Sequence, residues 1–122
     1  MGYYTKHRIR IINEYNTEEN LEELKEFIEK ISGYSFYMSE GVIYDEGIKW
    51  YECKNNMAAV SRFLPDYKIQ VKGKGEEGEV WESIFQDGDY YDNDYCFFTD
   101  NESESESEEK IYIQINKQKY RE

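Results

Sequence analysis

The sequence predicts an α+β domain of the ferredoxin-like class, in which a mostly antiparallel sheet carries two helices on one face. Two segments with helical spacing of apolar residues lie among segments of alternating polarity, in the order β-α-β-β-α-β-β-β. The first six elements match the split β-α-β arrangement of ferredoxin-like domains. A chain of 122 residues suits one domain, so we predict a single domain over residues 1–122.

The N-terminal third predicts a strand followed by a helix. Residues 6–15 alternate isoleucines with arginines, which is typical of a strand. Asn16 can cap a helix, and Glu19 three residues later completes a capping box. Gly33 suits the left-handed residue that ends a helix. The predicted helix carries one apolar stripe, formed by Leu21, Leu24, Phe27, Ile28 and Ile31.

The middle of the chain predicts two strands and a second helix. Residues 34–38 and 42–44 form one strand that is broken at Gly41, and residues 48–53 form a second strand. The Asp45-Glu46-Gly47 turn predicts a hairpin between these two strands. The short helix that follows has Asn55 or Asn56 as its cap, an apolar stripe at Met57, Val60 and Leu64, and Pro65 at its end.

The C-terminal part predicts strands that alternate with polar segments. Residues 67–72 alternate apolar and polar side chains, residues 80–85 form another strand, and a turn follows at Asp87-Gly88. The acidic, aromatic segment 76–100 has no clear period beyond that turn. The Ser/Glu-rich segment 100–110 predicts a mobile loop, and residues 111–116 predict a last strand.

Negative charge is concentrated in one segment of the chain. The formal net charge is −12, from 27 acidic and 15 basic residues. Fourteen of the acids lie within residues 75–109, which contain neither Lys nor Arg, and the remainder of the chain is slightly basic. Such an asymmetry bears on binding partners, and it says nothing about the fold.

Several classes of protein are disfavoured by composition. No apolar run approaches the roughly 20 residues of a membrane span, and the N-terminus lacks the apolar core of a signal peptide. Cys53 and Cys96 are far apart and lack metal-ligand spacing, so we expect two free thiols. The expected location is the cytoplasm of a bacterial host.

No catalytic or metal motif stands out. His7 is the sole histidine, no orienting carboxylate or nucleophile is placed near it by the sequence, and we expect it at the surface. The acids after Asp87 and Asp92 fail the calcium-loop pattern in both registers. The sequence 72–75 lacks the phosphate-loop signature. We therefore predict a protein without enzymatic activity, cofactor or metal.

Residues 48–90 carry a family resemblance. It rests on the segments Ile48-Lys49-Trp50-Tyr51, Phe63-Leu64-Pro65-Asp66 and Lys74-Gly75-Glu76-Glu77, and on Trp81, Phe85 and Gly88. The stretch resembles the ferredoxin-like domain of YubB-type phage and mobile-element proteins. Asp89 departs from that pattern, in which an aromatic residue and a lysine follow the turn. The resemblance implies a fold and a phage or mobile-element origin, and it supplies no catalytic residues.

The acidic, aromatic segment is the predicted functional surface. Its carboxylates can imitate nucleic-acid phosphates, and its aromatic side chains can anchor a protein interface. We therefore predict an anti-CRISPR-like inhibitor that blocks a basic nucleic-acid-binding protein, such as a CRISPR effector or a nuclease. The predicted partner-binding residues are Glu76, Glu77, Glu79, Glu82, Asp87, Asp89, Tyr90, Tyr91, Asp92, Asp94 and Tyr95.

Four alternatives stay open at this point. The chain can be an immunity protein or antitoxin that neutralises a basic nuclease, a small acidic module whose charge only keeps it in solution, or a small enzyme. A nucleic-acid-binding module is the fourth, although direct binding of nucleic acid or membrane is not expected. It would use the bases of the two ends of the chain: Lys6, Arg8, Arg10, Lys117, Lys119 and Arg121.

Overall fold

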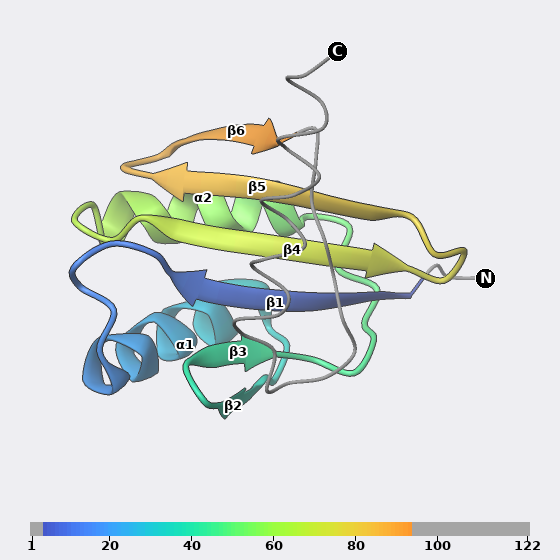
Figure 1. Ribbon diagram of the computed structural model, residues 1–122, viewed down its shortest axis with the longest axis horizontal. Coiled ribbons are helices and arrows are strands. Elements are labelled where there is room, and N and C mark those ends of the chain that lie inside the picture. Colours follow the sequence, from blue (N-terminus) through green and yellow to red (C-terminus); the bar gives the residue numbers. More distant parts are fainter. Residues whose placement is uncertain (1–3, 94–122) are drawn as a thin grey trace, which may run out of the picture.

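The computed structural model describes residues 4–93, which form a six-stranded antiparallel sheet and two helices (Figure 1). The strand order is β2-β3-β1-β4-β5-β6. The predicted α+β class is confirmed, and the first four strands have the order expected of a ferredoxin-like sheet, which β5 and β6 extend. The elements are β1 (Thr5–Ile11), α1 (Glu18–Ser32), β2 (Tyr37–Ser39), β3 (Val42–Tyr44), α2 (Cys53–Phe63), β4 (Ile69–Gly75), β5 (Val80–Gln86) and β6 (Asp89–Asn93).

Helix α1 follows the predicted apolar stripe but has a different cap. The N-cap is Thr17, whose hydroxyl oxygen accepts a hydrogen bond from the Asn20 backbone N–H at 3.1 Å. The prediction of Asn16 is wrong by one residue, because Thr17 has the extended backbone that a cap requires. Gly33 ends the helix at φ 82°, as predicted.

The hairpin prediction in the middle of the chain is wrong. Strands β2 and β3 pair with each other across a turn at Glu40 and Gly41, which have φ 53° and 82°. Residues 48–53 do not form a strand, because the chain makes a single bridge from Ile48 to Thr5 and then leaves the sheet. Helix α2 already begins at Cys53, and no side chain caps it.

Strands β4, β5 and β6 form two successive hairpins. The predicted turn between β5 and β6 is confirmed, with Asp87 at φ 53° and Gly88 at φ 87°. Strand β6 was not predicted, because its residues are exposed and lack apolar alternation. The predicted loop 100–110 and strand 111–116 lie outside the described residues.

One face of the sheet carries both helices and the apolar core. Figure 1 shows α2 behind β4 and β5, and α1 beside β3. Side chains of alternate strand residues, such as Ile9, Val71 and Phe85, join Leu24 of α1 and Met57 of α2 in one buried cluster. The prediction of two helices on one face is confirmed. Of the helices described over residues 4–93, neither has the length and apolarity needed to cross a membrane.

The opposite face of the sheet is polar and crowded with cations. The alternation of side chains places there the bases of the two central strands, β1 and β4. In this register Arg8 lies opposite Lys72, and Lys6 lies opposite Lys74. We define the basic face by Lys6, Arg8, Arg10, Lys72 and Lys74.

Candidate functional site

The predicted acidic surface is divided between the two ends of β5. Glu76, Glu77 and Glu79 belong to the exposed turn that precedes this strand, Asp87 lies in the turn that follows it, and Asp89 comes directly after that turn. Seven residues of strand separate the two groups by about 20 Å. The acids thus form two clusters in place of one continuous surface. The predicted site residues Asp94 and Tyr95 lie outside the described residues.

The second cluster combines acids with exposed tyrosines at one edge of the sheet. We define the acidic edge as Asp87, Asp89, Tyr90, Tyr91 and Asp92. Strand β6 is the outermost strand described on this side, and Tyr90 and Tyr91 are 46% and 54% exposed. The two rings lie on opposite faces of the sheet, so the edge presents aromatic surface in two directions.

Contacts with the core hold this edge in place. The Tyr90 ring stacks on Phe85 with the ring centroids 5.1 Å apart. Lys54 of α2 lies 5.6 Å from the centre of the Tyr90 ring, and its Nζ lies 3.2 Å from Asp92 Oδ2. The Ser83 hydroxyl donates a hydrogen bond to Asp92. This bond, aided by Lys54, lowers the pKa of the Asp92 carboxyl, so Asp92 keeps its charge in mildly acidic solution.

Glu82 does not belong to the exposed surface. Its side chain is 2% exposed, and its Oε2 accepts hydrogen bonds from Gln70 Nε2 and Asn93 Nδ2, each at 3.0 Å. The carboxylate lies opposite Lys72, on the sheet face without helices. Its Oε1 is buried and has no hydrogen-bond partner within the described part of the chain. Glu82 is therefore a buried side chain on this face of the sheet, although we predicted it at the binding surface.

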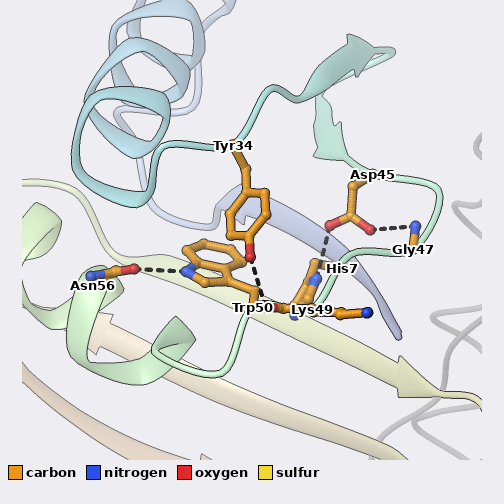
Figure 2. Close-up of polar contacts among 7 residues, drawn as sticks. All are labelled: His7, Tyr34, Asp45, Gly47, Lys49, Trp50 and Asn56. Atoms are coloured by element: carbon orange, nitrogen blue, oxygen red, sulfur yellow. Dashed lines mark hydrogen bonds and ion pairs between the residues drawn. The ribbon is translucent and has the colours of Figure 1, made fainter. Parts of the chain in front are cut away.

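A buried polar network surrounds the sole histidine (Figure 2). His7 is only 1% exposed, so its prediction as a surface residue is wrong. Its Nδ1 lies 2.8 Å from Asp45 Oδ2, and the Gly47 backbone N–H donates to Asp45 Oδ1 at 2.8 Å. The edges of Trp50 and Trp81 pack against the imidazole, with ring centroids 5.1 and 5.9 Å away. The pair thereby fixes the segment after β3 to the central strand β1.

Two further hydrogen bonds extend this network to both helices. Tyr34, just after α1, donates its hydroxyl hydrogen to the Lys49 carbonyl at 2.7 Å. Trp50 Nε1 donates to Asn56 Oδ1 of α2, also at 2.7 Å. As Figure 2 shows, both bonds end on the segment that connects β3 to α2. This irregular segment is therefore held by side chains, which explains how it stays ordered without strand pairing.

A hollow of about 310 Å³ borders the network. Its lining includes Cys53 and also His7, whose ring is held by Asp45, and thiol enzymes use a cysteine, a histidine and an orienting carboxylate. Burial, followed by the charge of Asp45, raises the pKa of the Cys53 thiol to about 12. A thiol with that pKa is protonated at neutral pH and is a poor nucleophile. The residues that line the hollow are Thr5, His7, Trp50, Tyr51, Cys53, Lys54, Asn55 and Trp81.

The sequence contained one signal for this network. His7 stands two and four residues before Ile9 and Ile11, so strand alternation places it on the face that those isoleucines bury. Its partner Asp45 is 38 residues away, and only the pairing of β1 with β3 brings the two together. Over residues 4–93 no group of three or more His, Cys, Asp or Glu side chains is arranged to hold a metal ion.

Comparison with known proteins identifies no relative of this chain. No protein-family profile, curated protein or solved structure matches this chain. The resemblance of residues 48–90 to YubB-type proteins therefore stays a prediction.

Proposed function

We propose that this protein is a non-enzymatic, anti-CRISPR-like inhibitor from a phage or mobile element, which binds a basic nucleic-acid-binding protein through the acidic edge. The observation that carries the proposal is an outermost strand in which two adjacent exposed tyrosines are flanked by carboxylates. A CRISPR effector or a nuclease has the cationic groove that such an edge would occupy.

The composition of the acidic edge suits a protein partner. The carboxylates Asp87, Asp89 and Asp92 can replace phosphates in contacts with lysines and arginines. Tyr90 and Tyr91 add aromatic contacts that carboxylates cannot make. Tyrosines are favoured anchors of protein interfaces, and arginines stack on their rings. Because Tyr90 already stacks on Phe85, it loses little side-chain freedom on binding.

The other acidic cluster supports a wide footprint. Glu76, Glu77 and Glu79 lie about 20 Å from the acidic edge, at the other end of β5. Double-stranded DNA carries one charge per about 1.7 Å of its axis, so a groove that accepts DNA offers cations over such a distance. We expect association to be fast and strongly dependent on salt.

A displacement assay with purified candidate targets tests the proposal. A CRISPR effector or nuclease is loaded with labelled nucleic acid, and the protein is added at increasing concentration. The wild-type protein is expected to displace the nucleic acid, and the D87N/D89N/Y91A variant to require at least about tenfold more protein. Asparagine tolerates the positive φ of position 87, so the turn is preserved.

The matched control is the E14Q/E22Q/Y37A variant. It removes two exposed acids and one exposed tyrosine far from β6, so its net charge changes equally. The control is expected to displace nucleic acid as the wild type does. Equal losses in both variants, or displacement that stays constant between about 0.1 and 0.5 M salt, would show that the acidic edge is not a mimic of nucleic acid.

A further inference from the structure

We propose that the hollow beside His7 is a binding site for a small phosphate monoester, whose phosphate lies at the N-terminus of α2. The inference goes beyond the proposed function, and its test needs neither a CRISPR effector nor a nuclease. The ligand class is a phosphate joined to a flat organic group, because the hollow offers both hydrogen-bonding groups and aromatic walls.

The first argument is the open start of α2. No side chain caps this helix, and no acidic residue stands in its first turn. The backbone N–H groups of Lys54 and Asn55 have no acceptor among the described residues. Unpaired N–H groups and the positive end of the helix dipole attract an oxyanion. Both residues line the hollow, so an anion bound to these groups would lie inside it.

The second argument is the orientation of His7, which is 1% exposed and lines the same hollow. Its Nδ1 lies 2.8 Å from Asp45 Oδ2 and carries the hydrogen, because an ionised carboxylate only accepts (Figure 2). Nε2 is on the far side of the ring and has no hydrogen-bond partner within residues 4–93. The single fully buried side-chain atom without a partner in this range is Glu82 Oε1, so Nε2 must open onto the hollow. A polar atom in that position points to a ligand.

The third argument concerns the proton, and it selects a phosphate monoester. Nε2 donates a hydrogen bond when the imidazole is protonated and accepts one when the ring is neutral. A phosphate monoester has its second pKa at about 6, so near neutral pH it presents either an O–H or a bare oxygen. One proton can therefore reside on the ring or on the phosphate, and a hydrogen bond forms in both cases. A sulfate ester has no such proton, and it would leave a neutral His7 without a donor.

The fourth argument is the charge around the hollow. Of the described residues that line it, Lys54 is a cation and none is an acid, although the formal net charge of the chain is −12. A hollow of about 320 Å³ at the start of α1 is, by contrast, lined by Glu18 and Glu40. The acids that bond to lining residues from outside the hollow are Asp45, Glu52 and Asp92.

The walls of the hollow suit a flat organic group. Trp50 and Trp81 are the two tryptophans of the chain, and both line the hollow. Tyr51, which is 69% exposed, adds a third aromatic side chain. Aromatic rings pack well against one another in edge-to-face and offset arrangements. The volume of about 310 Å³ is near the lower end for ligand sites, which suits one ring with its phosphate.

Titration with phenyl phosphate tests the proposal. Both tryptophans line the hollow, so tryptophan fluorescence and the two indole N–H resonances in NMR spectra report on binding there. We expect a Kd below about 1 mM for phenyl phosphate. Phenyl sulfate, inorganic phosphate and benzyl alcohol are each expected to bind at least about tenfold more weakly. Equal binding of phenyl phosphate and phenyl sulfate, or titration without a shift of either indole resonance, would overturn the proposal.

Substitutions at Lys54 and Asp92 separate a ligand site from a purely structural ion pair. K54Q removes the cation of the hollow and is expected to raise the Kd for phenyl phosphate about tenfold. D92N breaks the same ion pair, whose atoms are 3.2 Å apart, but leaves the ammonium group to the ligand. We therefore expect D92N to bind phenyl phosphate at least as tightly as wild type. Equal losses in the two variants would contradict a phosphate beside Lys54.

Two further variants test His7 and net charge. In H7N the amide can still donate to Asp45, but the group at Nε2 is lost, so phenyl phosphate is expected to bind at least about tenfold more weakly. Circular dichroism checks that H7N is folded, and if it is not, the comparison of K54Q with D92N decides. K25Q is the control, since it removes one charge and the 3.1 Å ion pair of Lys25 with Glu29 on α1. Its Kd is expected to stay within about twofold of wild type. A loss in K25Q as large as in K54Q would attribute the effect to net charge and refute the site.

Discussion

His7 and Asp45 show how single buried polar groups stabilise this fold. The Asp45 carboxylate has two partners, the buried His7 ring and the half-buried Gly47 backbone N–H. Removing the Asp45 carboxylate leaves a buried imidazole nitrogen and a backbone N–H without their acceptor. The pair therefore contributes more through the cost of breaking it than through its direct attraction.

We predict that D45A lowers the free energy of unfolding by about 1–3 kcal/mol. Urea denaturation monitored by tryptophan fluorescence measures this, because Trp50 and Trp81 both pack against His7. E46A removes the exposed neighbouring acid and is expected to change stability by less than about 0.5 kcal/mol. Equal effects of the two substitutions would contradict a structural role for the pair.

Gly73 is required by the close approach of a tryptophan. A Cβ atom built at this position would lie 2.2 Å from the Trp81 ring, which is far inside van der Waals contact. We predict that G73A destabilises the protein by about 1–3 kcal/mol through overpacking. In a W81A background the same substitution is expected to cost much less. A double-mutant cycle in urea measures the difference, and additive costs would show that Trp81 is not the cause.

At the scale of elements, long periodic segments were predictable and irregular ones were not. The stripe of α1 and the alternation of β4 follow directly from their apolar spacing. Residues 48–53 read as a strand, yet Trp50 leaves the sheet to pack among His7, Tyr34 and Phe36. Strand β6 was missed because both of its faces are exposed, so no apolar alternation marks it.

The cap of α1 offers a test at this scale. Thr17 supplies the hydroxyl that accepts from the Asn20 N–H, so T17A is expected to lower the free energy of unfolding by about 1 kcal/mol. N16A, one residue earlier, is expected to cost less than about 0.5 kcal/mol. Thermal or urea unfolding of the two variants measures the difference. A larger loss of stability in N16A than in T17A would support the capping box at Asn16 that the sequence predicted.

At the scale of the molecule, the candidate site depends on pairings that local sequence does not contain. The acidic edge follows from composition, but the separation of its acids from Glu76, Glu77 and Glu79 depends on the length of β5. The basic face arises only when β1 pairs with β4, more than sixty residues later in the chain. The sequence therefore predicted the charges and the fold class, and the topology decided which charges meet.

The stability of the whole molecule is expected to fall in alkaline solution. Burial, followed by the hydrogen bond to Glu23, raises the pKa of Tyr67 to about 12, and burial raises that of Cys53 to about 12. Both groups favour the folded state while protonated. Their contribution is full below the ordinary pKa values of 9.0 and 10.0, and it is lost as pH rises towards about 12.

Urea unfolding at several pH values between 9 and 12 measures this loss. Y67F removes one of the two groups, so its stability should decline less steeply with pH than that of the wild type. The exposed Tyr37 provides the control, and Y37F is expected to keep the wild-type slope. Identical slopes for Y67F and wild type would show that Tyr67 ionises normally in the folded protein.

The central place of β1 has a consequence for biosynthesis. This strand leaves the ribosome before the other strands of the sheet, yet one of its two neighbours is β4, which cannot pair with it until residues 69–75 have emerged. A nascent chain therefore holds an isoleucine-rich strand with an open edge while most of the domain is being translated. Closure of the sheet is a late event that requires nearly the whole domain, and a chain interrupted before β4 exposes the strand best suited to aggregate.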